Sequence, residues 1–114
     1  MTITEPTLIC SLDEIDDPGS HGFSVQLADE TLEGFVVHHN GSVYAYRNRC
    51  PHTGSPLDWV EHQFLDLDQA FIQCAVHDAR FQVDDGACIA GPCVGDRLEA
   101  LRIEVKDNAV YLLG

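Results

Sequence analysis

The chain has 114 residues, a length that suits one domain with a small core, and 45% of them are hydrophobic. Nineteen acidic residues face six basic ones, which gives a formal net charge of -13 at pH 7. A phosphate backbone or an anionic lipid surface would repel this charge, so nucleic acids and membranes are not expected partners. The acidity either keeps a small protein soluble or steers docking onto a basic partner surface, and both explanations stay open.

The first half of the chain is predicted to form short strands separated by turns. Strands are expected at residues 8–10, 23–27, 33–38 and 43–46, and residues 23–27 show the alternation of a strand with one buried face. Residues 13–22 are acidic and contain Pro18-Gly19, so a loop is expected there. Asn40-Gly41 is typical of a two-residue hairpin turn between the last two of these strands.

The second half combines shorter strands with loops. Residues 47–59 hold Cys, Pro, His and Gly in quick succession without periodicity, and residues 60–70 are acidic and irregular. The expected features that follow are strands at 70–73 and 80–83, loops at 74–79 and Gly91-Pro92-Cys93, a turn at Asp84-Asp85-Gly86, and a closing hairpin of residues 101–105 and 109–113 around Asp107-Asn108. Together they predict one all-β domain over residues 1–114.

The N-terminus has neither a positive segment nor a long apolar run, and no stretch approaches the roughly 20 apolar residues needed to cross a bilayer. We therefore expect a cytoplasmic protein. Its five cysteines are then expected to be metal ligands or buried thiols rather than disulfides, because the cytosol is reducing.

Two short motifs carry the chemistry of the chain, Cys50-Pro51-His52 and Cys74-Ala75-Val76-His77. Together they offer two thiolates and two imidazoles. A structural zinc site uses the same donors, but its usual order pairs the cysteines in one knuckle and the histidines on a helix. A gap of one residue between Cys50 and His52 is awkward for one tetrahedral ion and suits two metals. In a 2Fe–2S cluster with mixed ligands, one iron takes both cysteines and the other takes both histidines, so we favour this cofactor over zinc.

The order Cys-x-His, a spacer of residues 53–73, then Cys-x-x-His resembles the pattern of Rieske proteins. The resemblance implies that Cys50, His52, Cys74 and His77 bind one 2Fe–2S cluster. It also implies the Rieske fold, in which small antiparallel sheets carry an inserted subdomain of two cluster-binding loops. Leu57 stands where the family has an apolar shield, and Gly91-Pro92 resembles the proline loop that covers the cluster.

Residues beside the ligands distinguish types within the Rieske family. Ser55 and Val76 stand where membrane-bound members have cysteines that form a disulfide between the loops, so no such disulfide is expected. Ala79 and Phe81 stand where high-potential members have a serine and a tyrosine that donate hydrogen bonds to cluster sulfurs. Because such bonds stabilise the reduced state, we predict a potential near the low end of the Rieske range of roughly -150 to +300 mV.

The resemblance implies a monomeric single-electron carrier rather than an enzyme. Its expected partners are a ferredoxin reductase and a terminal ring-hydroxylating oxygenase, and no 2-His-1-carboxylate iron site is recognisable in the chain. The alternatives are a small subunit of a nitrite-reductase-type enzyme, a stand-alone redox sensor and a structural zinc module.

The remaining cysteines and histidines are expected to have no role at the cluster. Cys10 is predicted to be a core residue of a strand. Cys88 and Cys93 are either a redox pair or small apolar side chains in a packed loop, and we favour the packed loop. The four histidines outside the motifs are predicted to be solvated surface residues; they are His21, His38, His39 and His62.

Overall fold

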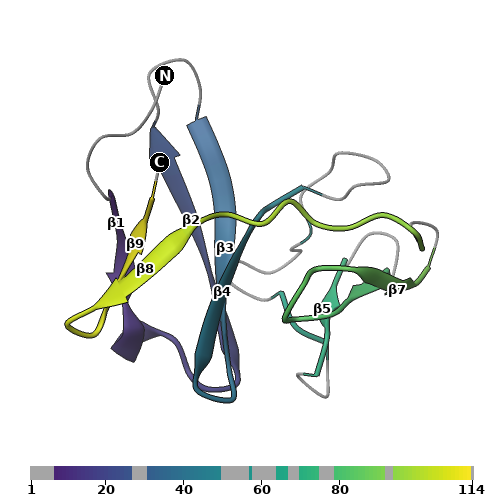
Figure 1. The fold of residues 1–114 in the computed structure, drawn as a ribbon, viewed down its shortest axis with the longest axis horizontal. Helices are drawn as coiled ribbons and strands as arrows, with labels where there is room; N and C mark the ends of the chain where they lie inside the picture. The colour runs from purple at the N-terminus through teal and green to yellow at the C-terminus, as the bar shows by residue number, and fades with distance from the viewer. Residues whose placement is uncertain are drawn as a thin grey trace.

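The chain forms small antiparallel sheets that lie side by side (Figure 1). The computed structural model describes residues 7–26, 31–49, 57, 64–66, 70–74, 79–91 and 94–113. The strand orders are β1-β9-β8 in the first sheet, β2-β3-β4 in the central sheet and β5-β6-β7 in the third sheet. The elements are β1 (Thr7–Ser11), the 3-10 helix η1 (Leu12–Glu14), β2 (Gly19–Gln26), β3 (Thr31–His39), β4 (Ser42–Arg47), β5 (Ile72–Gln73), β6 (Arg80–Phe81), β7 (Cys88–Ala90), β8 (Ile103–Lys106) and β9 (Ala109–Leu112). Apart from η1, the described residues are strands, turns and irregular segments, which confirms the all-β prediction.

Both predicted hairpin turns are present. Asn40 and Gly41 have φ values of 53° and 79°, and they join β3 to β4 where His39 faces Ser42. Asp107 and Asn108 have φ values of 52° and 63° and join β8 to β9. Two-residue turns of this kind need positive φ at both positions, which Asn, Asp and Gly tolerate better than other residues.

The prediction of a loop over residues 13–22 is wrong at both ends. The chain turns through η1, where the Ser11 hydroxyl accepts from the Asp13 N–H at 3.4 Å and the Glu14 carboxylate accepts from the Ser11 N–H at 3.3 Å. β2 then begins at Gly19, opposite His38 of β3. The two halves of this capping box satisfy helix-end donors reciprocally, which stabilises a turn that acidity alone does not indicate.

The Asp17 side chain attaches the segment before β2 to the β3–β4 turn. Its carboxylate accepts from the N–H groups of Asn40 and Gly41 at 2.8 and 2.7 Å, and these bonds lower the pKa of Asp17. His38 lies beside it, with Nε2 3.6 Å from an Asp17 oxygen. The prediction that His38 is a solvated residue without a partner is therefore wrong, because strand pairing brings it to this carboxylate.

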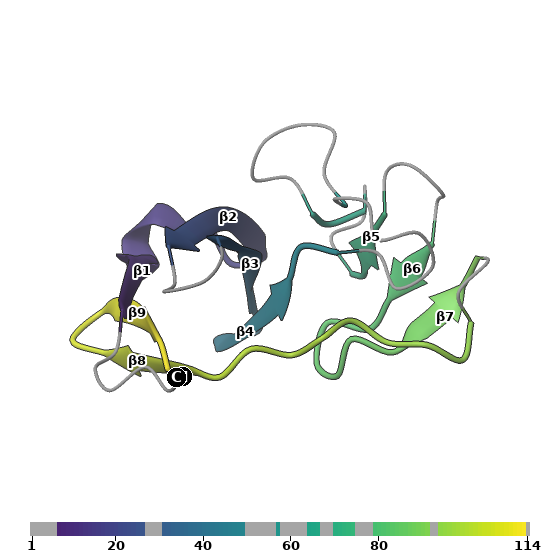
Figure 2. The same cartoon turned by 90° about the horizontal axis from the view of Figure 1, so that it is seen from above.

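The core has two parts, which contain alternate residues of β3. Figure 2 shows the central sheet between the first and third sheets. The part beside the third sheet contains Phe35 and Phe64, whose rings stack with centroids 4.2 Å apart and planes 8° from parallel. The other part contains Cys10, Val36 and Val110 and lies towards the first sheet. The central sheet therefore supports both the terminal strands and the segment that carries the second predicted ligand motif.

No helix among the described residues is long and apolar enough to span a bilayer.

Candidate metal centre

Cys74 lies at the end of β5, where short strands hold it rigidly. Ile72 and Gln73 of β5 pair with Phe81 and Arg80 of β6, and the Gln73 N–H donates to the Phe64 carbonyl at 2.9 Å. The Cys74 N–H donates to the Ala79 carbonyl at 2.8 Å. This bond closes the base of the predicted 74–79 loop, so both ends of the second ligand motif's loop are held in place.

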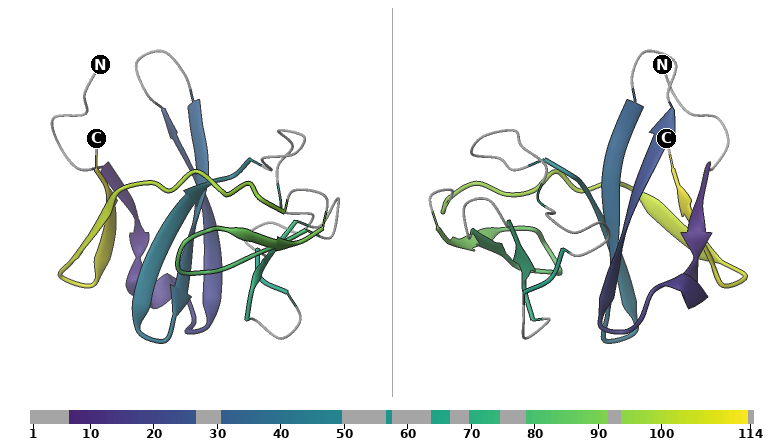
Figure 3. Two further views of the ribbon diagram at one scale, coloured as in Figure 1. Left: turned by 45° about the vertical axis from the view of Figure 1, so that its right-hand side comes forward. Right: turned by 180° about the vertical axis from the view of Figure 1, so that it is seen from behind.

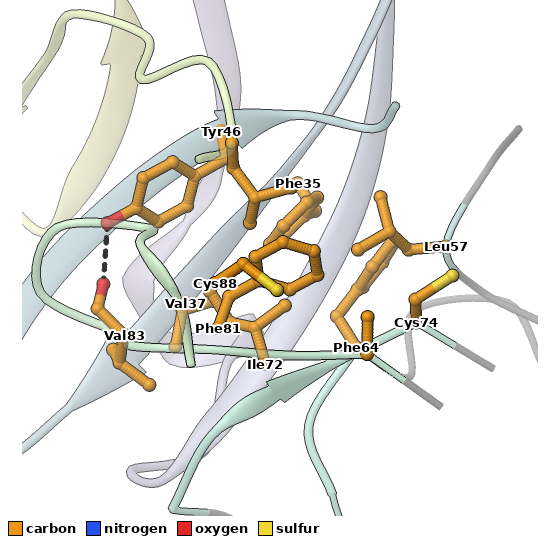
Figure 4. Close-up of a cluster of buried hydrophobic side chains, with 12 residues drawn as sticks. Phe35, Val37, Tyr46, Leu57, Phe64, Ile72, Cys74, Phe81, Val83 and Cys88 are labelled. Carbon is orange, nitrogen blue, oxygen red and sulfur yellow. Dashed lines mark hydrogen bonds between the residues drawn. The ribbon is translucent and has the colours of Figure 1, made fainter. Parts of the chain in front are cut away.

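The Cys74 thiol is fully buried and forms no disulfide. Figure 4 shows its sulfur beside the Leu57 side chain, at the end of the aromatic core that contains Phe64. Leu57, Ala79 and Phe81 are also fully buried. A thiolate ligand in such an apolar pocket is shielded from water, and these described residues therefore fit one side of an iron–sulfur centre.

Asn48 holds the end of the first predicted cluster loop. Its side-chain oxygen accepts from the Leu57 N–H at 2.8 Å, so the chain on either side of residues 49–56 is held together. Sequence reasoning missed Asn48, because a single asparagine after a strand carries no signal for a bond to a residue nine positions later. Leu57 is confirmed as a buried apolar residue at this place, while Arg49 is exposed.

Of the four predicted ligands, the structure places Cys74. Cys50, His52 and His77 lie outside the described residues, as do Ser55, Val76, Pro92, Cys93 and His62. The complete ligand set therefore stays a prediction. The hydrogen bond between Cys74 and Ala79 and the burial of Cys74 support it.

Gly91 brings the predicted third loop against the second ligand loop. It has a φ of +97°, and a Cβ at this position would lie 2.8 Å from the Ala79 Cα and 3.1 Å from its Cβ. Only glycine allows both this backbone conformation and this approach. The contact places Gly91 beside Ala79, at the end of the second predicted ligand loop, while the covering role of the Gly91-Pro92 loop stays a prediction.

We expect Gly91→Ala to lower the free energy of unfolding by about 3 kcal/mol, because it adds both backbone strain and a clash with Ala79. Gly95→Ala is the matched control, since Gly95 has a φ of +103° but no atom within 4 Å of the place that its Cβ would take. It should cost about 1 kcal/mol from strain alone. Denaturant unfolding of both holoproteins measures the difference, and equal losses would show that Gly91 does not approach Ala79 in solution.

Asp66 is a buried carboxylate in the acidic segment that precedes β5. It accepts from the N–H groups of Ala70 and Phe71 at 3.0 and 3.3 Å, and Arg80 Nε lies 4.0 Å away. Residues 60–70 were predicted to be irregular, and that prediction gave Asp66 no structural role. Asp66 closes the turn into β5 and so helps to fix the position from which Cys74 extends.

The remaining cysteines agree in part with expectation. Cys10 is 5% exposed and belongs to the core, as predicted. Cys88 is 6% exposed and donates to the Ala90 carbonyl at 3.3 Å, but it lies in β7 rather than in a loop. The three residues of β7 are too few to show a periodic pattern, which explains why this strand was missed. The pairing of Cys88 with Cys93 stays untested.

His21 was predicted to be a solvated residue without a partner, and this is wrong. It lies half-buried in β2, where its ring comes close to Cys10 and Glu14. The ligand atoms of these three side chains all lie within 4.8 Å of one another. Burial and the neighbouring Glu14 carboxylate raise the pKa of the Cys10 thiol to about 11. This group shares no residue with the predicted cluster ligands.

The described fold is a small all-β domain whose third sheet ends in a buried cysteine, Cys74, at the start of the second predicted ligand loop. The family model of the Rieske [2Fe-2S] domain matches residues 5–106, and the chain therefore belongs to this family. Its cofactor is a 2Fe–2S cluster. This confirms the resemblance on which the sequence prediction depends.

Solved structures agree with the family assignment. The ferredoxin of carbazole 1,9a-dioxygenase from Nocardioides aromaticivorans IC177 is 26% identical, with a TM-score of 0.73, and the match covers 96% of this chain and 98% of the ferredoxin. A chain in the complex of reduced oxygenase and oxidized ferredoxin of carbazole 1,9a-dioxygenase has 21% identity, a TM-score of 0.73 and coverage of 96% and 93%. The terminal oxygenase of carbazole 1,9a-dioxygenase from Novosphingobium sp. KA1 has 20% identity and a TM-score of 0.74; the match covers 98% of this chain and 30% of the oxygenase. No curated protein sequence matches the chain significantly.

Proposed function

We propose that this chain is a one-electron carrier whose 2Fe–2S cluster is bound by Cys50, His52, Cys74 and His77. It accepts electrons from a reductase and delivers them to a terminal ring-hydroxylating oxygenase, and it is not itself an enzyme. The observation that carries this proposal is the family match, together with the likeness to a dioxygenase ferredoxin over nearly the whole length of both chains. We further propose that residues 1–114 form one domain and act as a monomer, since a carrier must dock with two partners in turn.

The bound cluster supplies a one-electron redox couple. The described residues contribute shielding and rigidity. Leu57 and Phe64 are buried beside Cys74 and shield it from water, and the bonds at Asn48 and Ala79 hold the bases of both loops.

Spectroscopy of the purified protein tests the proposal. Iron and acid-labile sulfide should be present in equal amounts, and the dithionite-reduced protein should give a rhombic Rieske paramagnetic signal. Reoxidation by a terminal oxygenase, with the carbazole enzyme as the first probe, should return one electron per chain. A colourless protein that contains zinc without sulfide would contradict the assignment of both ligands and function.

We expect electron delivery to the oxygenase to slow by about tenfold between low and high salt, because the acidic carrier is steered towards a basic surface. Among the described residues from β5 to the segment before β8, the exposed acidic side chains include Asp84, Asp85, Asp96 and Glu99. Stopped-flow reoxidation at several salt concentrations measures this effect.

The variant Asp96→Asn should slow reoxidation at low salt and flatten its salt dependence. Asp13→Asn is the matched control, because it removes one exposed charge from η1, at the other end of the molecule. If both variants behave alike, the steering depends on net charge rather than on a docking face.

A further inference from the structure

The residues Cys10, Glu14 and His21 come together because the chain reverses sharply after β1. Cys10 is the last but one residue of β1, beside an irregularity in the pairing of β1 with β9. The capping box of η1 turns the chain, and Glu14 ends that turn. β2 then runs back past it and carries His21. Figure 3 shows η1 at the end of β1 that lies away from the chain termini.

The three side chains have the chemistry of a zinc site. Thiolate, imidazole and carboxylate are the donors that Zn²⁺ takes, at bond lengths of about 2.0–2.3 Å. Such bonds place tetrahedral ligand atoms about 3.3–3.8 Å apart. The ligand atoms here already lie within 4.8 Å of one another, and Glu14 is exposed. Binding therefore requires the three ligand atoms to approach one another by about 1 Å, and the exposed Glu14 side chain is the least restrained of the three.

The burial of the three residues also fits an ion that enters from solvent. Cys10 is 5% exposed, His21 is half-buried and Glu14 is exposed, so the sulfur lies deepest and the carboxylate outermost. One Glu14 oxygen accepts the long 3.3 Å bond from the Ser11 N–H. A carboxylate has two oxygens and about four acceptor positions, so Glu14 can keep this bond and bind a cation.

We propose that Cys10, Glu14 and His21 form a second metal site, which binds Zn²⁺, is separate from the cluster and has water as its fourth ligand. On binding, the S–H bond of Cys10 breaks, its proton passes to solvent and the sulfur bonds to the ion. The site joins β1 of the first sheet, and η1 that follows it, to β2 of the central sheet. Zinc at this place therefore stabilises the contact between two sheets, at the end of the molecule away from β5, β6 and β7 (Figure 1).

Equilibrium dialysis of the holoprotein against Zn²⁺, followed by elemental analysis, tests the site. The wild-type chain should bind one zinc ion while its iron content stays unchanged, and its melting temperature should rise with zinc concentration. Cys10→Ala and His21→Ala should each weaken zinc binding by at least about tenfold, by analogy with the loss of other groups at metal sites. Glu14→Gln should weaken it less, because the amide oxygen still reaches the ion.

Two matched variants control for burial and for residue type. Cys88→Ala removes a thiol that is almost as buried as Cys10, and His39→Ala removes a half-buried histidine from the same sheet as His21. Both should bind zinc as the wild type does. The proposal is overturned if the wild-type holoprotein binds no zinc, if His21→Ala binds it unchanged, or if Cys88→Ala loses it to the same extent as Cys10→Ala. Because the iron content is followed throughout, these outcomes are independent of whether the chain is an electron carrier.

Discussion

A Cys74→Ala chain is expected to purify without iron and without acid-labile sulfide. Cys74 is the proposed ligand that the structure places, fully buried at the end of β5 beside Leu57. Alanine removes the thiolate but adds no polar group, so the apolar pocket is preserved while the iron loses a ligand. We expect the visible absorption and the rhombic paramagnetic signal to disappear, and iron to fall from about two atoms per chain to almost none.

The matched control for this variant is Cys88→Ala. Cys88 belongs to the same core cluster, is 6% exposed and, like Cys74, forms no disulfide. Its replacement creates a cavity of the same size, which should cost about 1–2 kcal/mol of stability and leave the iron in place. If Cys74→Ala kept normal iron and sulfide, Cys74 would not be a ligand. If both variants lost iron equally, the loss would reflect a weakened core rather than a missing bond.

The parts of the fold that the sequence predicted well depend on local chemistry. Asn40-Gly41 and Asp107-Asn108 require positive φ and fix the register of two hairpins without help from the rest of the chain. The strands on either side of these turns were predicted to within a few residues. The capping box from Ser11 to Glu14 is also a local signal, a serine followed three residues later by glutamate, and it could have identified η1.

The parts that the sequence did not predict depend on contacts between distant residues. Asn48 and Asp66 hold the chain around Cys74 through side-chain hydrogen bonds from backbone N–H groups. The pattern of hydrophobic residues does not predict such bonds. His21 and His38 lie in strands whose pairing brings them to Glu14 and Asp17, respectively. A single histidine in the sequence does not indicate which side chain it will contact, because the register of the sheet determines its neighbours.

The candidate cluster site was predictable as a set of residue types and spacings, and the family match supports that prediction. The spacing of Cys74 and His77 says which side chains can share one loop. It does not say how the loop is closed, which depends on the Cys74 to Ala79 bond and on the approach of Gly91. Tyr46 illustrates the same limit, since its hydroxyl donates to the Val83 carbonyl at 2.6 Å across 37 positions (Figure 4).

The variants Ala79→Ser and Phe81→Tyr are each expected to raise the reduction potential by about 40 mV. Both positions are fully buried in the core cluster of Cys74, and neither native side chain can donate a hydrogen bond. A hydroxyl donor favours the state with more negative charge, which is the reduced one. If the bond is about 1 kcal/mol stronger in that state, the conversion of 59 mV per tenfold for one electron gives this shift.

Redox titration monitored by the paramagnetic signal measures the potentials. Phe23→Tyr is the matched control, because it adds the same hydroxyl to a half-buried ring of β2 that packs in the other core cluster, and it should leave the potential unchanged. The added oxygen at Phe81 has to fit a closed core, so some loss of stability is expected as well, about 1–3 kcal/mol. A rise in potential at both positions, without a rise in Phe23→Tyr, indicates a donor near the cluster rather than a general effect of an added hydroxyl. If neither Ala79→Ser nor Phe81→Tyr moves the potential upwards, residues 79 and 81 do not face the cluster, and the low potential inferred from them has no basis.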